Sequence, residues 1–180
     1  SDFFFNEDEN YSLTLDYTDV DNDLADMTFS ISNGENITAT QESGAEYRIT
    51  FTAEEDWTGS ETFTVSISDG ELLDSQAFTV TVDLVNDPPV LTVSNTSVEF
   101  DEDSGIHSIS YEATDIDGDE LTATLTQCEA NDEGMIIAQL MESLQKINLS
   151  SASDYNGTGC VTLIIDDGTF DGTVSSVITQ

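Results

Sequence analysis

The feature that most constrains this chain is an internal repeat, because four short motifs occur twice, in the same order and at a nearly constant spacing. The motif pairs are residues 6–9 with 101–104, 19–23 with 115–119, 56–59 with 154–157, and 68–70 with 166–168. A period of about 100 residues is too long for a solenoid, whose repeats run to about 20–50 residues. The repeat therefore predicts two similar domains in tandem.

The join between the two repeats contains the sequence Asn-Asp-Pro-Pro at residues 86–89. Proline fixes its own φ and favours an extended conformation in the residue before it, so the join is predicted to be stiff. We place repeat 1 at residues 1–87 and repeat 2 at residues 88–180. Residues 90–93 precede the acidic motif of repeat 2 and have no full counterpart in repeat 1, so repeat 1 is predicted to be truncated at its N-terminus and the chain to be a piece of a longer array.

Most of the chain has the pattern of short strands. Residues 63–67 and 77–82 alternate apolar and polar side chains, which gives each strand one buried and one solvated face. Similar runs occur at residues 11–17, 27–31, 47–51, 121–125 and 161–165. Many short strands separated by turn residues predict an all-β sandwich in each repeat.

Residues 136–145 are the exception, because their apolar side chains recur at helical spacing without Gly, Pro or Thr. We predict one short helix here, in the second repeat, with Leu140 and Leu144 facing the core. A strand is the alternative.

The charge balance limits the partners of this chain. It has 38 acidic residues against 2 basic ones, for a formal net charge of -36. Self-repulsion opposes compaction unless bound divalent cations or bulk salt relieve it. The same charge excludes nucleic acid and argues against anionic membranes, and no apolar run is long enough for membrane insertion.

Acidic clusters in loops are the only sites where chemistry is expected. Calcium binds about six to eight oxygen ligands from carboxylates, carbonyls and water. The loop of residues 19–23 begins like an EF-hand, but the Gly and the terminal Glu of that motif are not in place and strands flank it. The alternative for every cluster is structural, because Asp and Asn are common turn residues and acidic runs often form a solvated face.

The ordered set of an acidic start, an Asp-x-Asp-x-Asp loop, Asp-Trp/Tyr-x-Gly, a terminal Asp-Gly and an Asn-Asp-Pro join resembles the cadherin-like repeats of large extracellular adhesins. The resemblance covers nearly the whole chain. It implies two tandem cadherin-like, immunoglobulin-like β-sandwiches joined by a short proline-containing linker, with calcium (Ca2+) at the junctions between repeats.

The resemblance also implies which oxygen ligands hold the calcium. One set is Glu7, Asp8, Asp56, Asn86, Asp87, Asp115, Asp117 and Asp167. A second set, for a preceding repeat, is Asp19, Asp21 and Asp69. The linker departs from the family pattern, because Asp83 lies one residue too far from Asn86. Outside the linker, Thr58 stands where a second carboxylate is common in the family. Fewer or weaker ions are therefore expected.

The two cysteines, Cys128 and Cys160, lie at the end of one predicted strand and the start of another. In an immunoglobulin-like sandwich these strands are antiparallel neighbours, so a disulfide is expected, with two free thiols as the alternative. A disulfide would indicate an oxidising compartment.

These observations predict a calcium-stiffened structural and adhesive segment of a larger secreted or cell-surface protein. The expected partners are neighbouring repeats of the same chain or array, and a cell-surface glycan or protein. The alternatives are a carbohydrate- or protein-binding module, which needs exposed aromatic side chains, and a subunit of an extracellular filament that completes repeat 1 with a neighbour's strand. An enzyme is not expected, because the single His107 has no catalytic setting and the paired carboxylates recur in both repeats.

Overall fold

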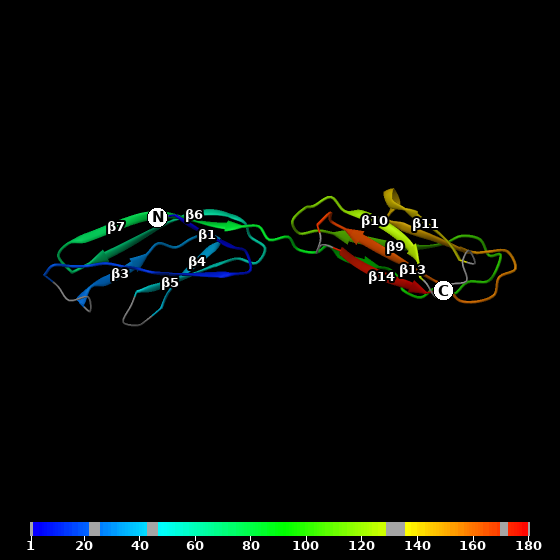
Figure 1. Cartoon of the computed structure of the whole chain (residues 1–180), viewed down its shortest axis with the longest axis horizontal. Coiled ribbons are helices and arrows are strands. Elements are labelled where there is room, and N and C mark those ends of the chain that lie inside the picture. The colour runs from blue at the N-terminus through cyan, green and yellow to red at the C-terminus, as the bar shows by residue number, and fades with distance from the viewer. Residues whose placement is uncertain (1, 22–25, 43–46, 129–135, 170–172, 180) are drawn as a thin grey trace. The chain divides into compact units, whose positions relative to one another are not determined.

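The computed structural model describes residues 2–21, 26–42, 47–128, 136–169 and 173–179, and it divides into two compact units, Ser1–Val85 and Asn86–Gln180 (Figure 1). Strands dominate both units, which confirms the all-β prediction. In the part of the chain that is described, no helix has the length and apolar character needed to cross a membrane.

Unit 1 is a sandwich of a four-stranded and a three-stranded sheet. The first sheet has the order β1-β7-β6-β3, and the second has the order β2-β5-β4. The strands are β1 (Phe3–Asn6), β2 (Asn10–Thr14), β3 (Thr28–Ile31), β4 (Ile37–Glu42), β5 (Arg48–Ala53), β6 (Gly59–Ser68) and β7 (Leu73–Asp83). Strand β1 pairs in parallel with β7 of its own chain, with Phe3 opposite Val80 and Asn6 opposite Asp83.

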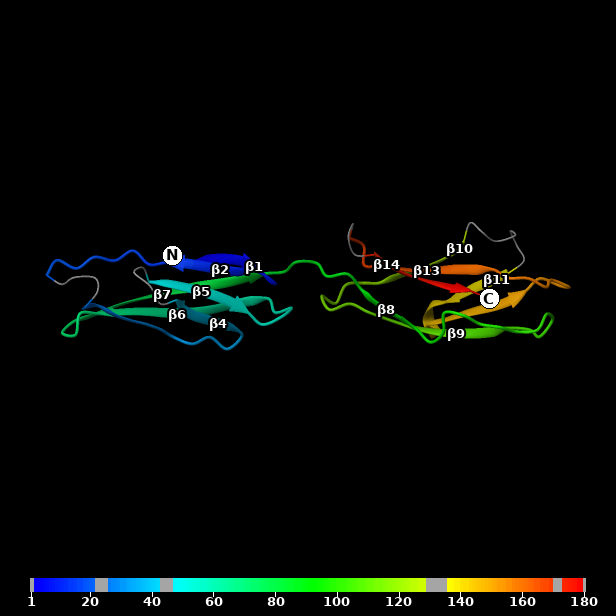
Figure 2. The same cartoon turned by 90° about the horizontal axis from the view of Figure 1, so that it is seen from below.

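Unit 2 repeats this plan, and Figure 2 shows β13 and β14 in one layer and β8 and β9 in the other. Its sheets have the orders β10-β13-β14 and β11-β12-β9-β8. The strands are β8 (Val90–Val93), β9 (His107–Thr114), β10 (Thr122–Gln127), β11 (Ile136–Met141), β12 (Lys146–Ser151), β13 (Cys160–Asp166) and β14 (Thr173–Thr179).

Each unit has its own hydrophobic core between its two sheets, as the alternating strand pattern requires. Phe51 and Phe63 lie at the centre of the first core, with ring centroids 5.3 Å apart. The second core is mostly aliphatic, around Ile147 and Leu163, with Tyr111 as its buried aromatic side chain. Trp57 packs against the first core and Tyr155 against the second, so these aromatic side chains contribute to packing at equivalent corners of the two sandwiches.

The prediction of a helix over residues 136–145 was wrong. Residues Ile136–Met141 form β11, which pairs antiparallel with β12, and only a single 3-10 turn follows, at Glu142–Leu144. Leu140 does pack against the core, but Leu144 is 59% exposed. The helical spacing arose because two apolar side chains, Ile137 and Leu144, point to solvent.

The side chain of Glu61, which belongs to no predicted catalytic or metal-binding motif, fixes one loop of unit 1. Glu61 on β6 accepts hydrogen bonds from the backbone N–H groups of Glu35, Asn36 and Ile37, at 3.1, 2.7 and 3.2 Å, and from the Asn36 side chain. Burial raises the pKa of Glu61, but these hydrogen bonds outweigh it and leave the pKa lowered. Glu61 therefore holds the start of β4 against β6.

Candidate metal centre

The loop between β9 and β10 brings three carboxylates together. The Oδ1 atom of Asp115 accepts hydrogen bonds from the backbone N–H groups of Asp117 and Asp119, at 3.0 and 3.3 Å, and this folds the loop back on itself. Gly118 takes a φ of 81°, which suits glycine. As a result, oxygen atoms of Asp115, Asp117 and Asp119 all lie within 4.8 Å of one another.

The first residues of unit 2 are fixed onto this loop and its neighbour. The Asp87 backbone N–H donates to Asp117 Oδ2 at 2.7 Å. The Asn86 side-chain amide donates to Asp167 Oδ2 at 2.9 Å and to Thr169 Oγ1 at 3.0 Å. The structure therefore gathers Asn86, Asp87, Asp115, Asp117 and Asp167, all of which were predicted ligands, at one end of unit 2.

Asp167 is 7% exposed and stays in its charged form because it is well hydrogen bonded. The amide of Asn86 is the largest cause of its lowered pKa, followed by the backbone N–H of Thr169. Hydrogen bonds to a carboxylate favour ionisation, whereas burial opposes it.

The carboxylate of Asp115 has one hydrogen-bonded oxygen and one oxygen without a donor among the described residues. Its Oδ2 atom is buried and has no hydrogen-bond partner among the described residues. A buried carboxylate oxygen without a donor is costly unless a cation neutralises it. Its neighbours Asp117 and Asp119 add negative charge rather than compensate for it. Because calcium prefers oxygen ligands of this kind, the residues present fit a calcium ion.

The linker end of unit 1 has a similar feature at Glu7, which is 1% exposed. The Oε1 atom of Glu7 accepts a hydrogen bond from the backbone N–H of Val85 at 2.7 Å, and its own N–H donates to Asp83 O at 2.9 Å. The Oε2 atom is buried and has no hydrogen-bond partner among the residues described. Glu7 therefore fixes the end of β7 and presents a second buried carboxylate oxygen.

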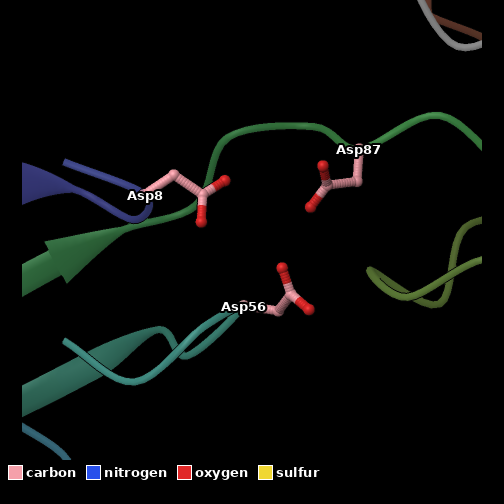
Figure 3. A group of neighbouring side chains, drawn as sticks. All are labelled: Asp8, Asp56 and Asp87. Carbon is pink, nitrogen blue, oxygen red and sulfur yellow. The ribbon is translucent and has the colours of Figure 1, made fainter.

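Asp8 and Asp56 lie on two loops of unit 1, in the turns that precede β2 and β6. Figure 3 shows the carboxylates of Asp8 and Asp56 pointing toward each other. Asp8 and Asp56 have φ values of 62° and 55°, and their counterparts Asp103 and Asp154 both have 56°. The left-handed turn is thus a shared feature of the repeats, as the structural alternative predicted, and it also aims the carboxylates of Asp8 and Asp56.

The predicted second set lies on loops of unit 1. The Oδ1 atom of Asp19 accepts from Asp21 N at 2.9 Å, the same turn that Asp115 makes. The Oδ1 atom of Asp69 accepts from the backbone N–H groups of Leu72 and Glu71, and these hydrogen bonds lower its pKa. Repulsion from Asp19 opposes the lowering of the Asp69 pKa. Asp23, the third acid of this loop, lies outside the described residues.

Two residues of the unit 2 group were not among the predicted ligands. Asp119 is the third acid of the Asp-x-Asp-x-Asp motif, so its position in the motif was a sufficient signal. Thr169 donates its backbone N–H and its hydroxyl to Asp167 Oδ1 at 2.7 and 2.8 Å. No pattern in the sequence points to Thr169, because its role depends on Asn86, far away in the chain.

Cys128 and Cys160 form a disulfide with a Cα–Cα distance of 5.5 Å. Cys128 directly follows β10, and Cys160 is the first residue of β13, which pairs antiparallel with β10. The expected bridge between neighbouring strands is therefore present in unit 2.

Comparison with known protein families assigns both units. The family model described as a bacterial Ig domain matches residues 1–83 and again residues 86–179. The chain belongs to the bacterial Ig domain family. These domains are non-catalytic modules, and tandem bacterial Ig domains, here with a disulfide, are typical of extracellular or surface proteins.

Solved structures agree with this assignment at the level of fold. Repeats EC1-2 of human protocadherin-24 are 17% identical to these bacterial Ig domains, over 90% of this chain and 80% of that one, with a TM-score of 0.50. The predicted resemblance to cadherin-like repeats is thus confirmed for the fold.

Two other similar structures are longer proteins. Drosophila N-cadherin EC1-3 is 11% identical over 85% of this chain and 53% of that one, with a TM-score of 0.43. An endo-fucoidan hydrolase of glycoside hydrolase family 107 is 21% identical over 99% of this chain, with a TM-score of 0.40, and the chain spans only 27% of that protein. No curated protein matches the chain.

Proposed function

We propose that this chain is a calcium-stiffened structural and adhesive segment of a larger secreted or cell-surface protein, in which repeats of this kind follow one another. The observation that carries the proposal is the buried Oδ2 atom of Asp115, which has no hydrogen-bond partner among the described residues and sits in a group of acidic oxygens. A divalent cation there would offset both the unpaired oxygen and the local repulsion.

The linker explains how calcium would act on stiffness. Its first part is held by unit 1, through Val85 and Glu7, and its next residues are held by unit 2, through Asn86 and Asp87. A cation bound by the carboxylates of Asp87, Asp115 and Asp117 would strengthen the hold on the linker without a new protein contact. Without a cation, repulsion among these carboxylates would weaken the hold on the linker.

The carbohydrate-binding alternative receives less support. Stacking on a sugar needs an exposed aromatic face, and the two aromatics at equivalent corners, Trp57 and Tyr155, pack against the cores of their units. The proposed partners are therefore neighbouring repeats of the array, with a cell-surface protein or glycan as the target of the whole protein.

Small-angle X-ray scattering and thermal unfolding test this proposal, each with calcium, with chelator, and with magnesium at equal ionic strength. Calcium should narrow the distribution of particle dimensions and raise the melting temperature, and magnesium should do so less, because it demands a strict octahedral geometry. Asp117→Asn should reduce the calcium effect, while Glu112→Gln on the exposed face of β9 removes the same charge and should not. Indifference to calcium in both measurements would refute the proposed stiffening.

A further inference from the structure

Matching hydrogen bonds allow the two units to be compared residue by residue along one edge of each sandwich. In unit 1, the backbone N–H of Leu15 donates to Tyr47 O at 2.9 Å. In unit 2, the backbone N–H of Tyr111 donates to Gln145 O at 3.0 Å. Tyr47 and Gln145 therefore occupy equivalent positions, as do Leu15 and Tyr111.

The acidic turns extend this comparison. Asp19 and Asp115 each accept a hydrogen bond from the backbone N–H two residues later, so they begin the same turn in the two units. Tyr17 and Ala113 lie two residues before these acids. Tyr17 and Ala113 are therefore also equivalent.

Strand pairing adds one more pair of positions. In unit 1, Phe29 of β3 lies opposite Ile67 of β6. In unit 2, Ala123 of β10 lies opposite Ile165 of β13. Both isoleucines lie two residues before an Asp-Gly turn, at residues 69–70 and 167–168. Phe29 and Ala123 are therefore equivalent.

Three aromatic rings fill this edge in unit 1. The ring centroid of Tyr47 lies 5.3 Å from that of Tyr17 and 5.3 Å from that of Phe29. The Tyr47 hydroxyl also donates a hydrogen bond to Met27 O at 2.7 Å. The three rings thus pack against one another, and a hydrogen bond fixes the central one.

Unit 2 has two methyl groups and an amide side chain at the same three positions, and a cavity of about 320 Å³ lies there. The hollow at the equivalent residues of unit 1 is less than half that size, at about 140 Å³. The less polar part of the lining of the cavity in unit 2 consists of Tyr111, Ala113, Leu121, Ala123 and Ile165. Atoms that face such a space lose packing contacts, so an occupant with a ring would restore what the smaller side chains remove.

The rest of the lining gives the cavity its charge. Glu120, Glu142 and Gln145 are exposed side chains that line it, and the two charged ones are both acidic. Burial and the charge of Glu142 raise the pKa of Tyr111, so its hydroxyl keeps its proton. A cation is the charge that complements this site, in a chain whose net charge is -36.

We propose that this cavity of unit 2 binds a small organic cation made of one aromatic ring and a short ammonium arm. The ring occupies the space that aromatic side chains fill in unit 1, against Ala113 and Ala123. The ammonium group lies at the acidic rim of Glu120 and Glu142. A volume of about 320 Å³ is at the lower end of the range of about 300–1,000 Å³ for small-molecule sites, which suits a ligand with a single ring. This inference does not depend on calcium.

An NMR titration of the full chain at physiological salt tests the site, with phenethylammonium as the probe. Two matched probes separate its parts, because 2-phenylethanol keeps the ring without the charge and butylammonium keeps the charge without the ring. We expect phenethylammonium to bind saturably, with a dissociation constant of about 1 mM or tighter, and to shift the amide signals of Ala113 and Ala123. Each matched probe should bind at least about threefold more weakly, since each lacks one set of contacts.

Two variants test the two halves of the site. Ala123→Phe with Gln145→Tyr restores two of the unit 1 rings and should weaken phenethylammonium binding at least about tenfold, because the rings occupy the space. Glu142→Gln should weaken it about two- to fivefold, as expected for an exposed ion pair, whereas Glu112→Gln on the exposed face of β9 should leave it unchanged. Glu142→Gln needs no repacking, so it tests the site even if the ring variant does not fold.

Three results would overturn the inference. The first is the absence of saturable binding of phenethylammonium. The second is equal binding of phenethylammonium and butylammonium, because attraction to the net charge would then explain the signal changes. The third is equal binding to the original chain and to Glu142→Gln.

Discussion

Replacement of Asp115 by Asn separates the two roles that its carboxylate plays. Asp115→Asn retains an Oδ1 acceptor for the backbone N–H groups of Asp117 and Asp119, so the turn is preserved. It removes one negative charge from the group formed by Asp115, Asp117 and Asp119. It also replaces the Oδ2 atom, which has no hydrogen-bond partner among the described residues, with an amide NH2 group. The variant should therefore have opposite effects in the absence and in the presence of calcium.

Without calcium, the variant should be more stable than the original chain. Two like charges at the 4.8 Å limit of this group repel by about 1 kcal/mol in water and about 3–4 kcal/mol at an effective dielectric constant of 20. The half-exposed setting favours the lower figure, so we expect a gain of about 1–2 kcal/mol. A gain of 1 kcal/mol raises the melting temperature of a unit of this size by about 4–8 °C.

With calcium, Asp115→Asn should be no more stable than the original chain, or should be less stable. A ligand present at 100 times its dissociation constant stabilises the folded state by about 2.7 kcal/mol. If loss of one carboxylate weakens calcium binding about tenfold, about 1.4 kcal/mol of that stabilisation is lost. The melting-temperature increase on addition of calcium should therefore be smaller for Asp115→Asn than for the original chain.

Differential scanning calorimetry of the full chain measures both effects, in chelator and in calcium at physiological salt. The transition of unit 1 serves as an internal reference, and Glu112→Gln controls for net charge. High salt should reduce the gain seen in chelator, because it screens the repulsion. A variant that is less stable than the original chain in chelator would contradict the reasoning, since Asp115 would then serve the turn alone.

Three further predictions concern residues that hold loops and strands in place. Glu61→Gln should destabilise unit 1 by about 1–3 kcal/mol in chemical denaturation, because a neutral amide replaces a charged acceptor of several hydrogen bonds; no change would mean that water satisfies those donors. Cys128→Ser with Cys160→Ser should cost unit 2 about 3–4 kcal/mol by the chain-entropy relation for this loop, and unchanged melting in the double variant would contradict it. The pKa of Asp167 is lowered, so its stabilising contribution is present above the ordinary Asp pKa of about 3.9 and is lost as the pH falls through the lowered value. Asn86→Ala should raise that pKa in an NMR titration and move the loss to higher pH, and an unchanged pKa would show that Asn86 is not its main cause.

The features predicted correctly from the sequence depend on local interactions. An Asp side chain that accepts from the N–H two residues later forms its turn whatever surrounds it, and both Asp19 and Asp115 do so. The alternating strands and the repeat spacing likewise identify the sandwich in each unit.

The features that were missed depend on contacts between distant segments. Residues Ile136–Met141 have an apolar pattern that suits a helix, and only pairing with β12 makes them a strand. Glu61 looks like any exposed acid on a strand until the loop at Asn36 folds over it. The 1% exposure of Glu7 depends on Val85, which is far from Glu7 in the sequence.

The proposed function depends on calcium binding by the acidic group at the start of unit 2. Long-wavelength diffraction from crystals grown with calcium tests it most directly, because an anomalous peak identifies the ion and its place. We expect a peak about 2.3–2.6 Å from carboxylate oxygens of Asp115 and Asp117, at a position that Asp87 can also reach. A well-ordered map with these carboxylates in place and no anomalous peak among them would contradict it.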